Sequence, residues 1–229
     1  MKVRIKFSKH GPVKYIGHLD IMRYFQKSMR RAEVDIKYST GFSPHQIMSF
    51  AQPLGVGMES EGEYLDIEVN SHNGAKDMMD RLNAVMVPGM RIESIVELPD
   101  GVKNAMASIS AASYTVTLKS GEQFPANVVA IADKFLSKDS IMITKETKKN
   151  TLEVDLKPHI YEAKMEDMIF TCFVDASSAG NIKSTQILEA MYAYAGVPFV
   201  KNDFQVTRMD TFTTVDNKFV PLDALGKDF

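Results

Sequence analysis

The chain has 229 residues, 45% of them apolar and 24% charged, which is the balance of a globular protein with one large domain or two small ones. Its single cysteine, Cys172, excludes a zinc or iron–sulfur site built from the chain's own cysteines, and its apolar neighbours indicate a core residue. The polar N-terminus is untypical of a signal peptide, and no apolar run approaches the ~20 residues of a membrane span. We therefore expect a cytoplasmic protein that does not contact a membrane.

The net charge of −2 is unevenly distributed along the chain. Residues 1–49 contain ten Lys and Arg against three Asp and Glu, a net charge of +7, so the remainder carries −9. A segment this basic can bind an anionic partner such as RNA. The alternative is a solvated helix face that is basic without a partner.

The first half of the chain predicts alternating strands and helices. Strict alternation predicts a strand at 2–8, and apolar residues at helical spacing predict a helix at 18–34, with a core stripe of Met22, Phe25, Met29 and Ala32. A short strand near Ile36 and a Gly/Pro-rich connection follow. We then expect a strand at 63–69, a helix at 75–86 ended by Pro88 and Gly89, and a strand at 91–98.

The second half of the chain repeats this order more loosely after a small, polar segment at 99–111 that is typical of a linker. The expected elements are strands at 113–119, 140–147, 151–157, 168–175 and 203–215, and helices at 125–136 and 184–196, the second capped by Ser184. A hairpin turn is expected around Lys148–Asn150, and extra strand material around Pro158–Lys164. The prediction is an α+β fold of two tandem ferredoxin-like (β-α-β-β-α-β) domains, 1–98 and 112–229.

The first predicted helix also carries a basic face. Arg23, Lys27, Arg30 and Arg31 fall within about 100° of one another, opposite the core stripe. By contrast, Lys2, Arg4 and Lys6 on the exposed face of the first strand should pair with Tyr64, Asp66 and Glu68 across the sheet, which neutralises them. Because the aromatic pattern of an RNA-binding sheet is also absent, we expect nucleic acid to meet the helix or the loops.

Three histidines lie in the first 45 residues. His18 opens the predicted helix on its apolar side, where it is either a packed residue bonded to backbone or a general acid/base. The spacing of His10, His18 and His45 matches no standard ligand set, so we expect no metal and no other cofactor. Asp20 has a sufficient role in the first helical turn, where it pairs with Arg23.

The connection after this helix contains STGFSPH, residues 39–45. Gly41 and Pro44 are ordinary turn residues, whereas a turn needs no imidazole at His45. We therefore take His45 as a candidate partner of His18. Phe42 either tucks beneath the loop or offers its ring to a nucleotide base.

The segments YIGHLD, STGFSPH and PLGVGMESEGEYLDIEV resemble the radical-SAM-linked protein family, an uncharacterised bacterial family encoded beside or fused to cobalamin-binding-type radical SAM proteins. The matching residues are Tyr15, His18, Asp20, Gly41, Phe42, Pro44, His45, Ser60, Gly62, Glu63 and Tyr64. Gly17, Ser43 and Gln46 depart from the pattern, so we expect no chemistry from their side chains. The resemblance implies a radical SAM partner and a genomic context of ribosomal-protein and ribonuclease genes.

Three functions follow from these features. The first is a non-catalytic RNA-binding or substrate-presenting module for a separate radical SAM enzyme, in ribosomal or transfer RNA modification, that holds RNA on Lys14, Arg23, Lys27, Arg30, Arg31 and Phe42. The second is a protein–protein adaptor for the same partner without RNA. The third is a metal-independent endoribonuclease with His18, His45 and Tyr15 as acid and base and Lys14 as the charge stabiliser.

Overall fold

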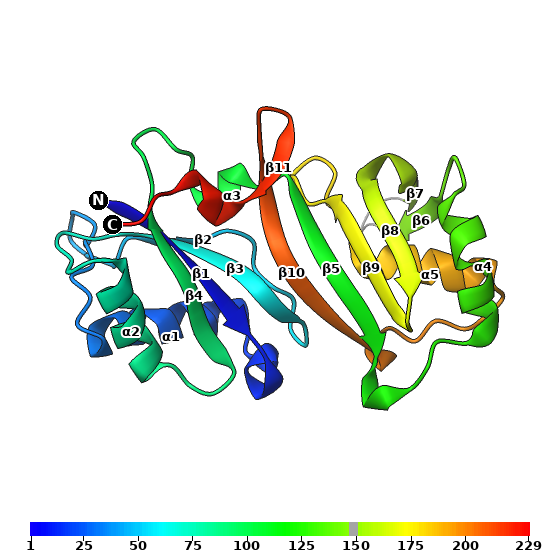
Figure 1. The fold of residues 1–229 in the computed structure, drawn as a ribbon, viewed down its shortest axis with the longest axis horizontal. Helices are drawn as coiled ribbons and strands as arrows, with labels where there is room; N and C mark the ends of the chain where they lie inside the picture. Colours follow the sequence, from blue (N-terminus) through cyan, green and yellow to red (C-terminus); the bar gives the residue numbers. More distant parts are fainter. Residues whose placement is uncertain (147–150) are drawn as a thin grey trace. The chain divides into compact units, whose positions relative to one another are not determined.

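The computed structural model describes residues 1–146 and 151–229, and the turn expected around Lys148–Asn150 lies outside these residues. The chain has a mixed α/β fold with mostly antiparallel strands and, in the described residues, five α-helices (Figure 1). It divides into two compact units: 1–110 with 210–229, and 111–209. These differ from the predicted domains 1–98 and 112–229, because the last 20 residues pack with the first unit.

The first unit contains β1 (Lys2–Lys9), α1 (His18–Arg31), β2 (Met48–Phe50), β3 (Glu59–Glu68), α2 (Ala75–Val85) and β4 (Met90–Glu97). β1 lies between β4 and β3, β2 pairs with the far side of β3, and all three pairings are antiparallel. The expected partners across β1 and β3 are confirmed: Lys2 lies opposite Glu68, Arg4 opposite Asp66 and Lys6 opposite Tyr64.

One face of this sheet carries the apolar core of the unit. Val3, Ile5 and Phe7, which alternate along β1, are buried together with residues of both helices, as the period-2 and helical patterns predict. The helical members of this cluster are Ile21, Phe25, Met29, Met78 and Leu82. Burying each such side chain contributes about 1.5–3 kcal/mol, so this layer holds α1 and its basic outer face in place.

The opposite face of the sheet is also covered, which corrects the expectation that Arg4 and Lys6 are exposed. Arg4 is completely buried, and the Lys6 side chain is 19% exposed. The cover consists of α3 (Ala105–Ser108) and of the chain end, where β11 (Lys218–Pro221) and a 3-10 turn (Leu222–Leu225) follow β10 (Phe204–Val215). Residues 99–111 are therefore not a plain linker, since they contain α3, whose Ala105 is fully buried.

Two local predictions in the first unit are wrong in detail. The strand expected near Ile36 is only an isolated bridge between Ile36 and Val69. A real strand, β2, lies instead inside the Gly/Pro-rich connection. It was missed because its three residues are too few to show an alternating pattern.

The second unit contains β5 (Ala111–Leu118), α4 (Ala126–Leu136), β8 (Ile160–Glu166), β9 (Ile169–Asp175) and α5 (Ser184–Tyr194). Its strand order is β10-β5-β9-β8, with residues 204–209 of β10 in this unit, while β6 (Met142–Glu146) and β7 (Thr151–Asp155) form a separate two-stranded sheet. The N-cap of α5 is Lys183 and not the expected Ser184. Cys172 is buried in β9 as predicted, and burial raises the pKa of its thiol to about 12.

No helix in the described ranges is long and apolar enough to cross a membrane.

Candidate nucleic-acid interface

The outer face of α1 is basic and exposed, as the helical spacing predicts: Arg23, Lys27, Arg30 and Arg31 all face solvent. Two of these cations have protein partners. Arg23 forms a 3.1 Å ion pair with Asp20, and Arg31 donates a 2.8 Å hydrogen bond to the Val85 carbonyl. The side chains of Lys27 and Arg30 form no ion pair or hydrogen bond with any residue that the structure describes, so their charges are available to a ligand.

A shallow depression of about 390 Å³ lies on this face, lined by Tyr24, Lys27, Arg30 and Arg31. The Tyr24 ring is held in place, since its hydroxyl accepts a 2.8 Å hydrogen bond from the Val87 backbone and its ring packs edge-on against Phe25. The depression therefore combines cations with a fixed aromatic ring, which suits a phosphate–base ligand. Tyr24 was not singled out from the sequence because it lies between the apolar stripe and the basic face.

His45 closes the loop that contains STGFSPH. The loop narrows at the bridge between Tyr38 and Gln46, and the Ser39 N–H donates to the His45 carbonyl at 2.8 Å. The Ser39 hydroxyl then lies 2.9 Å from Nδ1 of His45 and accepts from the His45 N–H at 3.1 Å. The imidazole thus takes part in the hydrogen bonds within the loop. The residue preferences of turns do not predict this short-range role.

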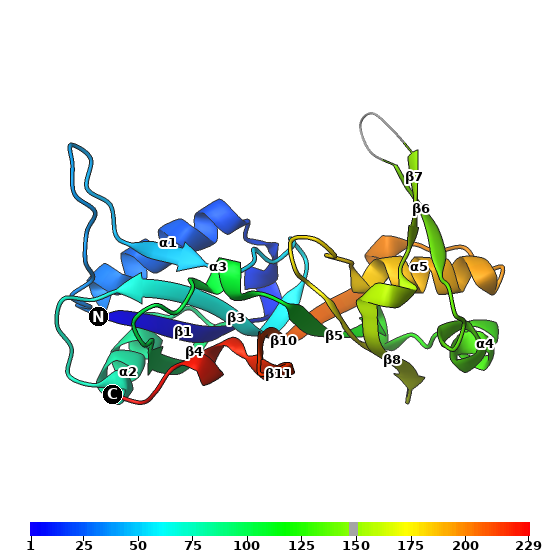
Figure 2. The same cartoon turned by 90° about the horizontal axis from the view of Figure 1, so that it is seen from above.

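The tip of the same loop is exposed. Gly41 has φ +112°, a conformation that favours glycine, and the Phe42 side chain that follows it is fully exposed. Phe42 does not tuck beneath the loop, so of the two predicted roles only an outward-facing ring agrees with its position. Figure 2 shows the loop between α1 and β2 extending outward from the first unit.

His18 is half-buried at the start of α1, and its ring packs edge-on against Phe50 at 5.3 Å. With Lys9 and Glu63 it borders a cavity of about 20 Å³, room for about one water molecule. Tyr15, by contrast, is 63% exposed, with Nζ of Lys14 5.7 Å from the centre of its ring. These contacts agree better with His18 as a packed residue than with His18 as a general acid or base.

The structure does not bring His18 and His45 together. No hydrogen bond joins them, and they share no contact among the described residues. The side chain of Gln46, beside His45, reaches the carbonyl of Gln26, which is eight residues beyond His18 and about 12 Å further along the helix axis. A paired-histidine catalytic site therefore has no geometric support here.

The residues just before the first motif segment meet the third segment around Glu59. This carboxylate accepts hydrogen bonds from Lys14 at 3.0 Å and from the Gly11 N–H at 3.1 Å, and His10 lies 3.8 Å away. Burial raises the pKa of Glu59, but these bonds and the charge of Lys14 outweigh it and lower the pKa overall. Lys14, a predicted RNA ligand, is thus already occupied by a carboxylate.

The remaining motif residues hold the first unit together. Ser60 and Glu63 are buried on β3, and a Cβ on Gly62 would lie 2.6 Å from Oδ1 of Asp210, so only glycine fits against β10. Tyr64 donates to Asp210 at 2.7 Å and lies 3.2 Å from Asp223. Burial and the two carboxylates raise its pKa strongly, which keeps the phenol protonated.

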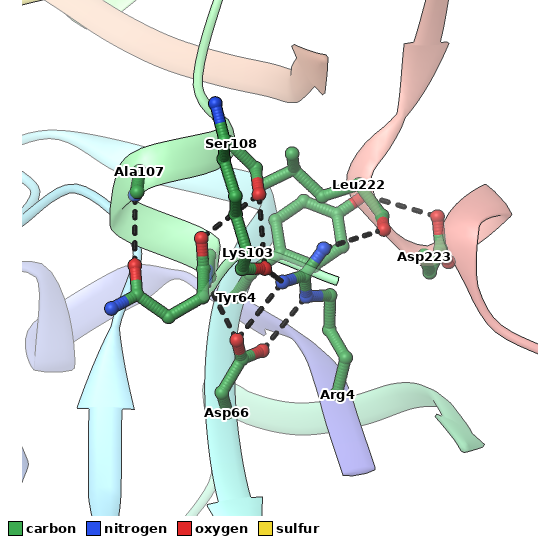
Figure 3. A network of polar contacts seen from close by, with 10 residues as sticks. Arg4, Tyr64, Asp66, Lys103, Ala107, Ser108, Leu222 and Asp223 are labelled. Atoms are coloured by element: carbon green, nitrogen blue, oxygen red, sulfur yellow. Dashed lines mark hydrogen bonds and ion pairs between the residues drawn. The ribbon is translucent and has the colours of Figure 1, made fainter. Parts of the chain in front are cut away.

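Arg4 forms the centre of a buried network on the same face (Figure 3). Its guanidinium donates to both carboxylate oxygens of Asp66, at 2.7 and 2.9 Å, and to the carbonyls of Leu222 at 2.9 Å and Lys103 at 3.3 Å. Asp66 also accepts from the Ala105 N–H at 2.7 Å. These groups saturate one another, so the network clamps α3 and the chain end onto β1 and β3 and leaves no group free for chemistry.

Within the described residues, no group of three His, Cys, Asp or Glu side chains is arranged to hold a metal ion. The fold and the site together define a class: a mixed α/β protein with a basic helical face and an exposed aromatic loop. The family model for uncharacterized proteins conserved in bacteria (DUF2344) matches residues 2–184, and the chain belongs to this family. No curated protein matches the chain. The family match extends past the N-terminal motifs through most of the second unit.

Proposed function

We propose that this protein is a non-catalytic RNA-binding or substrate-presenting accessory module whose RNA site is the outer face of α1. The observation that carries the proposal is the position of Lys27 and Arg30, whose side chains have no partner among the described residues, beside the fixed ring of Tyr24. The expectation of a separate radical SAM enzyme as partner, and of ribosomal or transfer RNA as the substrate, rests on the motif resemblance alone.

The distribution of charge partners supports this choice of surface. Other cations of the basic N-terminal segment already meet carboxylates: Arg4 pairs with Asp66, Lys6 with Asp210, Lys14 with Glu59 and Lys37 with Glu68. These four pairs offset four of the seven net positive charges of residues 1–49, whereas the side chains of Lys27 and Arg30 pair with no carboxylate in the part of the chain that the structure describes. Unneutralised cations on a rigid helix are what phosphate binding requires.

Capture of the tagged protein from its host, with and without nuclease treatment, tests the proposal. The wild type should retain RNA, and the Lys27→Gln/Arg30→Gln variant should retain far less, because two phosphate contacts are lost. The matched control is Lys76→Gln on α2, whose lysine is exposed but paired with Asp80. Equal RNA recovery by all three proteins would refute the proposal.

A protein–protein adaptor is the second candidate, and one observation favours it. Tyr15, Leu19 and Val56 expose 61–64% of their surfaces at the start of α1, and the Gly57 N–H bond to the Lys14 carbonyl holds the Val56 loop beside Tyr15. An apolar patch of this kind suits a protein surface. In the capture experiment an adaptor would keep a protein partner after nuclease treatment, lose it in Leu19→Asp, and carry no RNA.

The endoribonuclease alternative has no comparable observation in its favour, because His18 and His45 do not share a site. It would require cleavage of cellular RNA in EDTA by the wild type and none by His18→Ala. We expect no cleavage by either protein.

We also infer that each unit follows the ferredoxin-like plan. Supporting this, β1 to β4 are ordered β4-β1-β3-β2 and the second unit is ordered β10-β5-β9-β8, which is the same order once β6 and β7 are treated as an insertion.

A further inference from the structure

We propose that the loop from Tyr38 to Gln46 reads an unpaired nucleotide: the ring of Phe42 stacks on a base of single-stranded RNA whose phosphates lie on Lys27 and Arg30. This inference rests on the proposed RNA-binding function and names its ligand class. It makes the protein selective for single-stranded RNA over duplex RNA.

Exposure alone would not carry this inference, because single exposed apolar residues are common on protein surfaces. What distinguishes Phe42 is that the loop beneath it is already ordered. Ser39 and His45 form three hydrogen bonds across the loop, between 2.8 and 3.1 Å, and the bridge from Tyr38 to Gln46 closes its base. A ring presented on an ordered loop loses little further conformational entropy when it binds.

The loop is fastened to the helix that carries the cations. The buried side chain of Gln46 donates a 3.3 Å hydrogen bond to the Gln26 carbonyl, and in an α-helix this carbonyl also accepts from the N–H of Arg30. The base of the loop therefore lies against the helical turn between Gln26 and Arg30. One ligand can reach both Phe42 and the cations of α1, because the four residue-to-residue steps from Tyr38 to Phe42 span at most about 14 Å.

The cations of α1 and the ring of Phe42 together determine the chemistry of the ligand. The cations bind phosphate and carry no base information, whereas an aromatic ring stacks on any base whose face is free. In a duplex the base faces are covered by their neighbours, so Phe42 has nothing to stack on. Two further aromatic rings can meet the same RNA strand. These are Tyr38, which is 45% exposed at the base of the loop, and Tyr24, which lines the depression on α1.

Binding of one short RNA, labelled with fluorophore, as a single strand and as a blunt duplex tests the inference. Stacking on one base is worth about 5- to 150-fold in affinity. We expect the wild type to prefer the single strand by at least about 5-fold, Phe42→Ala to lose this preference, and Phe42→Tyr to keep it. Because Phe42 meets no phosphate, its removal should leave the salt dependence unchanged, whereas Lys27→Gln/Arg30→Gln should weaken the salt dependence and keep the preference.

The outcomes separate this inference from the function on which it rests. If the wild type binds neither RNA, the RNA-binding function fails and this inference with it. If the wild type binds RNA with the expected salt dependence but Phe42→Ala binds both forms as the wild type does, only the stacking loop is refuted. Ser39→Ala provides a second variant in which Phe42 is intact: loss of two bonds to His45 should weaken single-strand binding several-fold and leave duplex binding unaltered.

Discussion

Replacement of Arg4 by Met tests the clamp that closes the second face of the first sheet. Arg4 is fully buried, and its guanidinium donates to Asp66, Leu222 and Lys103. Met fills much of the same volume but leaves the Asp66 carboxylate buried with only the Ala105 N–H as a charge-stabilising donor among these contacts. Breaking a buried pair by removing one partner costs about 3–5 kcal/mol, which is the expected loss of unfolding free energy.

Urea denaturation followed by circular dichroism measures this loss. With a slope of about 2 kcal/mol per molar urea, the transition of the first unit should move down by about 1.5–2.5 M. Lys76→Met is the matched control, because Lys76 forms a 2.6 Å but exposed pair with Asp80, and such pairs contribute about 0–1 kcal/mol. A shift for Arg4→Met no larger than that of the control would refute the clamp.

The double variant Arg4→Met/Asp66→Leu separates the ion pair from the packing. Replacing both partners with apolar residues removes the uncompensated buried carboxylate, so most of the lost stability should return. A double variant as unstable as Arg4→Met alone would mean that the contacts to Leu222 and Lys103 carry the effect.

Three further predictions concern single residues. Gly62→Ala should cost about 1–3 kcal/mol in unfolding free energy, because its Cβ would lie 2.6 Å from Oδ1 of Asp210, whereas Gly17→Ser, with nothing within 4 Å, should cost little; equal urea midpoints would contradict this. Cys172 should react with a thiol reagent at pH 8 about 1000-fold more slowly in the folded protein than in urea, since burial raises its pKa from 9.0 to about 12 and lowers the thiolate fraction accordingly; equal rates would show that β9 is open. Because the pKa of Glu59 is lower in the folded than in the unfolded state, its carboxylate stabilises the fold at pH values above the unfolded pKa, and this contribution is lost as the pH falls through the folded pKa. Glu59→Gln should therefore reduce the difference in unfolding free energy between pH 7 and pH 3. An unchanged difference would contradict the pairing of Glu59 with Lys14.

Local periodicity explains which features could be predicted from the sequence. The alternation of Val3, Ile5 and Phe7 and the stripe of Phe25 and Met29 depend only on neighbouring residues, and both are confirmed as core. The exposed basic face of α1 follows from the same geometry. The buried and exposed faces of β1 and α1 can therefore be assigned largely from local sequence, although the second face of β1 is covered by distant residues.

The burial of Arg4 could not be predicted in this way. Its acceptor on Leu222 is 218 residues away, and the pattern of β1 alone makes the Arg4 face look exposed. Long-range pairing of this kind leaves no periodic signal. It also explains why residues 210–229 belong with the first unit and not with the second.

The separation of His18 from His45 could not be predicted from sequence pattern either. The hydrogen bond between Ser39 and His45 is local, but the two residue types do not predict it, because Ser and His form many other kinds of hydrogen bond. This hydrogen bond gives His45 a structural role in the loop that does not involve catalysis.

The most direct test of the central claim is the salt dependence of RNA binding to the outer face of α1. If Lys27 and Arg30 each meet one phosphate of a single strand, log K should fall against log salt with a slope of about −1.4, at about 0.7 per contact. Lys27→Gln/Arg30→Gln should bring the slope close to zero, while Lys76→Gln leaves it at the wild-type value. A flat response in the wild type, or equal slopes in all three proteins, would contradict the assignment of α1 as the RNA-binding surface.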